Sequence, residues 1–205
     1  LIAFVMLFIA RSKILYVITL VLSGAIGAYI LIDLIPERLS RFNLIEPCSD
    51  DLGDGYHLCW SLMAIGSGGI FGKGLGASTT KLSYLYGAHT DFIFAILAEE
   101  LGIFGVVFTI ILFYLFIKKC FFVGDKALRV GLIFQGYLSY AIGIFITLQA
   151  VLSMAVTLGI APTKGLAMPF FSYGGSNYLI SILSITIVLK RYRDVYKQSL
   201  NSSLR

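Results

Sequence analysis

The chain has 205 residues, of which 58% are hydrophobic and 13% charged, and its formal net charge is +5. Its mean hydropathy of +0.90 is far above the balance of soluble domains. This composition excludes an ordinary soluble enzyme. It also makes the positive charge a signal of membrane orientation and of contact with anionic lipid, not of nucleic-acid binding.

Long apolar runs predict the fold. A helix needs about 20 apolar residues to cross about 30 Å of hydrocarbon. The third of four such runs, residues 127–157, is too long for a simple span, so it tilts, breaks near Gly143 or projects into water. The sequence thus predicts an all-α fold, a polytopic transmembrane helix bundle. The four spans are expected at about 14–35, 92–117, 127–157 and 176–190.

The first residues form a further apolar stretch, Leu1–Ala10, which ends at Arg11 and Lys13. A signal peptide would have a basic region before the apolar stretch and a small-residue cleavage site after it, and neither is present. We therefore expect this stretch to be the end of a preceding span. The chain is then the C-terminal portion of a larger membrane protein.

Basic residues gather on one side of the predicted spans. The positive-inside rule places that side in the cytoplasm. The segments 36–90 and 159–175 then face outside, the first as a large loop and the second as a re-entrant loop. The last basic cluster, "KRYRDVYK", could bind anionic headgroups or simply anchor the topology. The cytoplasmic basic residues are Arg11, Lys13, Lys118, Lys119, Lys126, Arg129, Lys190, Arg191, Arg193, Lys197 and Arg205.

The large external loop contains an amphipathic stretch and a glycine run. We expect a short interfacial helix near 56–65, followed by the run "GSGGIFGKGLG". This run fails the phosphate-loop pattern because Gly74, not serine or threonine, follows Lys73. Two interpretations remain open. Its backbone N–H groups and Lys73 could hold a phosphate, or its glycines could permit a hinge or a close backbone approach.

Cysteine and histidine are sparse. Cys48 and Cys59 share the external loop and could form a disulfide in an oxidising compartment, whereas Cys120 is cytoplasmic. No cluster of histidine, cysteine and acidic residues has metal-ligand spacing, so we predict no metal site.

Three stretches carry a resemblance to a known family. They are "YHLCWSLMAIGSGGIFGKGLG" (56–76), "GAHTDFIFAILAEELGIFG" (87–105) and "LGIAPTKGLAMPFFSYGGSN" (158–177). In order and spacing they resemble the SEDS family, the FtsW/RodA-type peptidoglycan glycosyltransferases of bacteria. The "PTKG" motif is similar to the FtsW, cell-division, branch. The family has ten spans, and this chain resembles its last four together with the end of the sixth.

The resemblance implies an activity and its setting. The family polymerises lipid II into glycan strands outside the bacterial cytoplasmic membrane, with polyprenyl pyrophosphate as the leaving group. For the FtsW branch this is septal cell-wall synthesis during division. Implied partners are a class B penicillin-binding protein, which is a transpeptidase, and other division proteins. A divalent cation could assist the pyrophosphate, but no ligand set for one is visible.

Asp91 is the predicted catalytic residue. The family's catalytic aspartate maps onto it in "HTDF", and Asp91 directly precedes the second predicted span at its outer end. There it could accept the proton of an acceptor sugar hydroxyl. The alternative is an N-cap for the following helix, a role that Thr90 could also fill.

Glu99 and Glu100 raise a different question, because a carboxylate in hydrocarbon is costly. They lie eight and nine residues beyond Asp91, too far around a helix to act with it as a paired acid and base. We expect one of them to join neighbouring segments and to support the floor of the groove. Pro162 and Pro169 are assigned a similar structural role in shaping the re-entrant loop.

Candidate contacts to substrate come from the external segments. Lys164 is the leading cation for the pyrophosphate, and the "SYGGSN" stretch offers hydroxyl and N–H groups at a helix start, although its glycines could simply permit a tight turn. Where the family usually has glutamine, this chain has His57 and Trp60, and it has Ser153 for asparagine and Asn177 for serine. The full set of predicted substrate contacts is Lys164, Lys73, Lys81, Ser172, Gly174, Gly175, Ser176, His89 and Thr90.

Two other functional classes also fit the polar residues. A lipid-precursor flippase or ion-coupled carrier would use buried carboxylates and broken helices, but would hold its charges near the bilayer midplane. Here only Glu99 and Glu100 lie deep in a predicted span, and the other polar groups are at its outer end. A scaffold for division proteins is the third class, and it is compatible with an enzyme.

Overall fold

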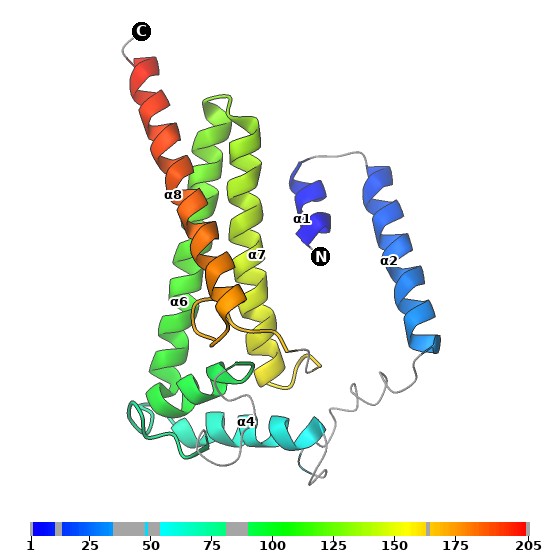
Figure 1. The fold of residues 1–205 in the computed structure, drawn as a ribbon, viewed down its shortest axis with the longest axis vertical. Helices are drawn as coiled ribbons and strands as arrows, with labels where there is room; N and C mark the ends of the chain where they lie inside the picture. Colours follow the sequence, from blue (N-terminus) through cyan, green and yellow to red (C-terminus); the bar gives the residue numbers. More distant parts are fainter. Residues whose placement is uncertain are drawn as a thin grey trace. The chain divides into compact units, whose positions relative to one another are not determined.

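The structure, a computed structural model, describes residues 2–10, 14–34, 48, 54–80, 90–162 and 165–203. Its main elements are all α-helices, and the described part of the chain contains no strand, so the predicted all-α class is confirmed (Figure 1). The helices are α1 (Ile2–Ile9), α2 (Ile14–Leu34), α4 (Asp54–Gly68), α6 (Ile93–Arg129), α7 (Ile133–Thr157) and α8 (Gly175–Ser203).

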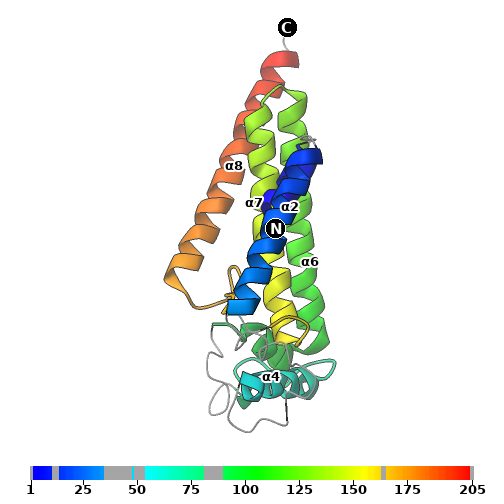
Figure 2. The ribbon, with the colours of Figure 1, turned by 90° about the vertical axis from the view of Figure 1, so that its right-hand side faces the viewer.

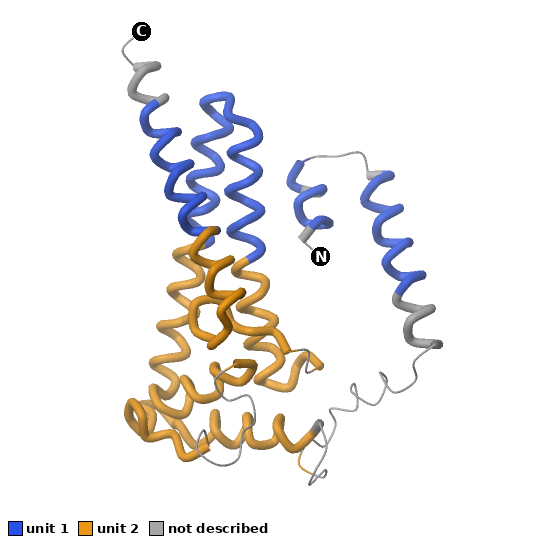
Figure 3. The backbone as a smooth tube through the Cα atoms, in the orientation of Figure 1, with its two compact units in different colours: residues 1–40, 117–145, 184–205 blue, residues 41–116, 146–183 orange. Residues whose placement is uncertain are grey.

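The chain divides into two compact units (Figure 3). Unit 1 contains α1, α2 and one part each of α6, α7 and α8, and unit 2 contains α4 and the other parts of α6, α7 and α8. The predicted site residues that the structure describes all belong to unit 2. The ranges are 1–40, 117–145 and 184–205 for unit 1, and 41–116 and 146–183 for unit 2.

Among the described residues, α6 and α7 are long and apolar enough to cross a membrane. They overlap the second and third expected spans, with different bounds. The first and last expected spans are covered by α2, with the shorter apolar stretch Leu15–Gly27, and by α8. Large apolar side chains of α6, among them Phe104 and Phe108, are exposed in the isolated chain. Such a surface is suited to lipid, because apolar side chains can face the hydrocarbon while the helix satisfies its own backbone hydrogen bonds.

Gly102 breaks α6 into two segments. Its φ of 65° and ψ of −162° are not helical, and a residue with a side chain would be strained there. The expected span 92–117 is therefore corrected: residues 93–101 form a separate helical segment, and the long apolar helix starts at Ile103 and ends at Arg129. At 1.5 Å per residue this second segment is about 40 Å long, enough to cross a bilayer. Glu99 and Glu100 thus precede the long helix.

The third expected span also needs correction. α6 continues to Arg129, a turn containing Gly131 with φ 83° follows, and α7 starts only at Ile133. No break occurs at Gly143. That glycine instead permits close packing, because a Cβ built on it would lie 2.7 Å from the Cβ of Cys120. The basic residues expected in the connecting loop, such as Lys118, are in the last turns of α6.

α4 carries the predicted interfacial helix and extends beyond both ends of the expected range 56–65. Cys59 on this helix forms a disulfide with Cys48, and their Cα atoms are 5.1 Å apart. The sequence left this bond open, and the structure forms it. Cys120 is a free, buried thiol in unit 1.

Within unit 2, α4 lies beside the 93–101 segment of α6. Figures 1 and 2 show both at the same end of this unit, with α4 across the direction of the long part of α6. Gly68 makes this contact close, since a Cβ on it would be only 2.0 Å from the carbonyl oxygen of Ala98. The site described below is built around this pair of helices and the segment 165–178.

Candidate active site

The glycine run inserts into the break of α6. In an unbroken helix, the N–H groups of Ile103 and Phe104 would bond the carbonyls four residues earlier, those of Glu99 and Glu100. The glycine run takes over all four groups. Lys73 N donates to Glu99 O (2.9 Å), Gly74 N to Glu100 O (3.0 Å), Ile103 N to Gly69 O (3.1 Å) and Phe104 N to Ile70 O (3.4 Å).

This arrangement decides between the two interpretations of the glycine run. The N–H groups of Gly72, Lys73 and Gly74 all donate to backbone carbonyls, so they do not form a phosphate-binding nest. The glycines serve a close backbone approach, because a Cβ on Gly72 would lie 2.2 Å from the carbonyl oxygen of Glu100. The phosphate interpretation of this part of the run is therefore wrong.

The Glu99 side chain is fully buried and belongs to the same junction. Its carboxylate accepts hydrogen bonds from Lys73 Nζ (2.7 Å), Ser78 Oγ (2.5 Å) and Thr79 Oγ1 (3.2 Å). The structure thus engages Lys73 in an ion pair, and its predicted contact with pyrophosphate would have to compete with Glu99. Glu100 is partly buried beside this cluster.

We expect loss of the Lys73 charge to destabilise the protein. Lys73→Met leaves Glu99 charged and buried without its cation, and breaking a buried pair costs about 3–5 kcal/mol. The Lys73 side chain is 35% exposed, so the lower end, about 3 kcal/mol, applies. The measurement is thermal unfolding in detergent, with Lys190→Met, at an exposed lysine of α8, as the control. A Lys73→Met protein that melts with the wild type while its KM for substrate rises would instead assign Lys73 to substrate binding.

Asp91 occupies the turn directly before α6 and is partly exposed. Two of its neighbours in the sequence, Phe92 and Phe94, are buried, and Phe92 packs with Ile96 and Trp60 in an apolar cluster. Burial raises the pKa of the Asp91 carboxyl above its usual value. The segment 165–178 approaches it as well, since a Cβ on Gly165 would be 3.5 Å from Asp91 Oδ2.

Ser172 connects the segment 165–178 to the chain at Asp91. Its hydroxyl accepts a hydrogen bond from Met168 N (2.6 Å) and donates one to Thr90 O (2.6 Å). The first of these bonds closes a turn over residues 168–172, in which Ser172 is 5% exposed and Pro169 is fully buried. The hydroxyl expected to contact substrate is therefore engaged inside the protein.

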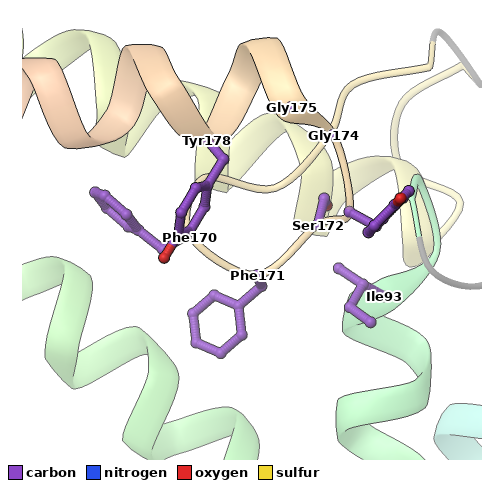
Figure 4. A pocket seen from close by; sticks show the side chains of 8 residues that line it. Ile93, Phe170, Phe171, Ser172, Gly174, Gly175 and Tyr178 are labelled. Atoms are coloured by element: carbon purple, nitrogen blue, oxygen red, sulfur yellow. The ribbon is translucent and has the colours of Figure 1, made fainter.

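A cavity of about 580 Å³ lies beside these residues (Figure 4). Its aromatic wall was missed by the sequence analysis, which weighed only the polar groups of "SYGGSN"; the adjacent run "PFFSY" was the available signal. Phe170 has a φ of 68°, a strained conformation for a bulky residue that often marks functional segments. The lining residues are Ile93, Phe170, Phe171, Ser172, Tyr173, Gly174, Gly175 and Tyr178.

Gln149 on α7 was also missed, although it is a polar residue within a long apolar run. Its Nε2 donates to Ala167 O and to Asn177 Oδ1, both at 2.9 Å, and so joins α7 to the segment that lines the cavity. Asn177, a departure from the family pattern, is therefore a partner of Gln149. Ser153, another departure, is fully buried one turn further along α7.

The remaining predicted site residues are distributed as follows. Ser176 is exposed in the first turn of α8, and Gly174 accepts a hydrogen bond from Tyr178 N (2.9 Å). Pro162 is partly buried. Among the described residues, no group of three or more histidines, cysteines or acids could hold a metal ion. Lys81, His89 and Lys164 lie outside the described residues.

These features define a class: a helical protein suited to the membrane, with a partly buried carboxylate next to an aromatic cavity. Comparison with known families gives the assignment. The chain belongs to the FtsW/RodA/SpoVE family, whose model, described as "Cell cycle protein", matches residues 1–197.

Curated relatives agree with this assignment. Proteins named "Probable peptidoglycan glycosyltransferase FtsW" are similar to the chain in Thioalkalivibrio sulfidiphilus (40% identity over 92% of this chain and 48% of the relative) and in Tolumonas auensis (43% over 91% and 49%). The relative in Hydrogenovibrio crunogenus is 46% identical over 76% of this chain and 40% of its own length. The chain spans about half the length of the curated relatives it matches.

A solved structure is similar in fold. It comes from a study of "Structural coordination of polymerization and crosslinking by a peptidoglycan synthase complex". The TM-score is 0.66 at 26% identity, over 94% of this chain and 53% of that one. The expected membership of the SEDS family is thus confirmed.

Proposed function

We propose that the chain is the C-terminal part of a peptidoglycan glycan-strand polymerase that uses lipid II, of the FtsW branch. The observation that carries the proposal is the position of Asp91, at the start of α6 and close to an aromatic cavity of about 580 Å³. The names of the curated relatives support the same activity.

In the proposed reaction, the acceptor sugar hydroxyl attacks the anomeric carbon of the donor. A carbon–oxygen bond forms there while the bond to the pyrophosphate breaks, and the electron pair leaves with the polyprenyl pyrophosphate. The hydroxyl proton passes to the Asp91 carboxylate. Burial helps this step, because a raised pKa makes the carboxylate a stronger base than a free aspartate.

The leaving group gains negative charge and needs donors or cations near it. Lys164 and Lys81 are proposed for this role. The N-terminus of α8, at the exposed residues Gly175 and Ser176, supplies positive dipole character in the same region. A divalent cation bound by the pyrophosphate is also compatible with this chemistry. The cavity beside Gly174 and Gly175 is proposed to hold part of the lipid-linked substrate.

The proposed setting is the bacterial cytoplasmic membrane, at the division septum, with four spans in the chain. Residues 36–90 and 159–175 would face outside. A class B penicillin-binding protein is the proposed partner, and the study of a peptidoglycan synthase complex that contains the similar structure supports this. The break at Gly102 argues against the carrier alternative, because Glu99 and Glu100 precede the long apolar helix and are not near its middle.

The disulfide supplies a test of the topology. In cells producing the protein with Cys120→Ser, a membrane-impermeant thiol reagent should label the protein only after mild reduction, because Cys48 and Cys59 are bonded. Labelling should not need permeabilised cells. Labelling that appears only after permeabilisation would invert the proposed orientation. The activity itself is tested by polymerisation of lipid II with wild-type protein and with the Asp91→Asn variant.

A further inference from the structure

The hydroxyl of Ser172 lies between two backbone segments that come from distant parts of the sequence. It accepts a hydrogen bond from Met168 N and donates one to Thr90 O, and both bonds are 2.6 Å long. The first contact is local and closes the turn 168–172. The second crosses 82 positions of the chain and holds the peptide group that joins Thr90 to Asp91.

Asp91 has few other constraints. Among the described residues, no side chain or backbone group forms a hydrogen bond or ion pair with its carboxylate, and Asp91 precedes the first residue of α6. Its position therefore depends on the backbone that carries it. On one side that backbone continues into α6, which the buried side chains of Phe92 and Phe94 anchor. On the other side, the bond from Ser172 fixes the Thr90 carbonyl.

The turn that carries Ser172 is packed against the rest of unit 2. Pro169 is fully buried, and Phe170 is held at a φ of 68° with its ring stacked on Phe113 at 6.4 Å. A segment with a strained backbone and a buried proline is suited to hold a bond partner in one place. A Cβ built on Gly165, in the same segment, would lie 3.5 Å from Asp91 Oδ2.

We infer that Ser172 is a positioning residue for Asp91, acting through the Thr90 carbonyl. Ser172 lines the cavity, but its hydroxyl already bonds two backbone groups of the protein. The inference rests on the proposed function, in which Asp91 is the base. It replaces the substrate-binding role that the sequence suggested for this serine. The reason is that the Ser172 hydroxyl already accepts one hydrogen bond and donates one inside the protein.

The physical consequence of losing the hydroxyl is local. Ser172→Ala leaves Met168 N and Thr90 O without this partner in a buried turn, so the chain before Asp91 relaxes toward other partners. A catalytic group displaced by about 1 Å can lower the rate by about 10²-fold. Substrate affinity should stay, because the cavity walls are contributed mainly by aromatic side chains.

The test compares Ser172→Ala with Ser139→Ala in the whole protein as the cell makes it, with its partner present. Ser139 is also a fully buried serine, but its hydroxyl bonds Gln135 O within α7, in unit 1. We expect Ser172→Ala to lower kcat by about 10–10²-fold with KM for lipid II changed less than about threefold. Ser139→Ala should keep both constants. Ser139→Ala should melt with the wild type, whereas Ser172→Ala should melt lower because two backbone groups lose this partner, so both constants are taken per folded molecule.

The decisive arm repeats Ser172→Ala in the Asp91→Asn background, where a residue acting through Asp91 should have no further effect. Equal losses in both backgrounds, a raised KM with kcat unchanged, or wild-type kcat would each overturn the inference. If Ser172→Ala does not accumulate, Ser172→Thr keeps the hydroxyl and should keep kcat; a well-folded threonine variant as inactive as Asp91→Asn would overturn it. A fully active Asp91→Asn protein would instead remove the proposed function.

Discussion

Asp91→Asn is expected to reduce glycan polymerisation per folded molecule by about 10²–10⁴-fold, the usual cost of losing a general base. Asparagine has the size of aspartate and can still cap a helix, so the turn before α6 should form as before. What it lacks is a basic carboxylate oxygen, because the neutral amide oxygen is far too weak a base to take the proton of the acceptor hydroxyl. The measurement is glycan chain formation from lipid II by the purified protein with its partner, normalised to folded protein.

Asp194→Asn is the matched control. Asp194 is in α8, its side chain is 39% exposed, and it pairs with Arg191 one turn away. A surface pair of this kind contributes little, about 0–1 kcal/mol, so activity should be unchanged. Glu99→Gln should mainly lower thermal stability, because it weakens the cluster around Lys73. A folded but inactive Glu99→Gln protein together with an active Asp91→Asn protein would exchange the roles assigned to these two carboxylates.

The same experiment has a pH dependence. Burial raises the pKa of Asp91, and only its deprotonated form can act as base. As the pH falls through this raised pKa, kcat should fall, and it should do so at a higher pH than the usual aspartate value near 4. The acid limb of the profile should disappear in Asp91→Asn, whose residual rate has no such group to titrate.

Gly68→Ala is expected to produce a large loss of stability. A Cβ at this position would lie 2.0 Å from the backbone carbonyl oxygen of Ala98, and backbone cannot move aside as the end of a side chain can. Forcing extra atoms into a packed contact costs about 1–3 kcal/mol, and a clash with backbone belongs at or above the upper end. The measurement is thermal unfolding of purified protein, followed by the yield of folded protein.

Gly66→Ala provides the control on the same helix. Nothing lies within 4 Å of a Cβ built on Gly66, and its conformation is helical like that of Gly68. Alanine there should be neutral or stabilise by up to about 1 kcal/mol, as in other helices. Of two variants with the same chemical change, two residues apart, only Gly68→Ala should therefore lower the melting temperature. Equal melting of both would contradict the close contact between α4 and the 93–101 segment.

The helical class was predictable because apolar runs of spanning length leave few alternatives. The runs could not locate the break at Gly102, since one glycine in a helix is usually tolerated, and its conformation here depends on the glycine run thirty positions earlier in the chain. For the same reason Glu99 was expected inside a span. The contact that defines its position, with Lys73, is tertiary and leaves no periodic trace in the sequence.

The site was predictable in part. Asp91 was predicted as the base from the "HTDF" motif and its place before an apolar run, and the structure locates it beside the segment 165–178. The candidate contacts around "SYGGSN" were chosen by chemical type. Chemical type indicates which hydrogen bonds a side chain can form, but not whether groups inside the protein already form them. Ser172 shows the difference, because its hydroxyl is engaged with Met168 and Thr90. The aromatic wall was overlooked because phenylalanine is common in membrane helices and was not weighed as a lining residue.

The exchange of hydrogen bonds at Gly102 also has a consequence for how the protein is made. The groups that satisfy the broken ladder of α6 belong to residues 69–74, which leave the ribosome before α6 does. During synthesis from the N-terminus, the segment 69–74 that pairs with the break is therefore already available when the long apolar helix emerges. A circular permutation that moved residues 69–74 behind α6 would send that helix toward the bilayer with four backbone groups unpaired, at a cost of several kcal/mol for each.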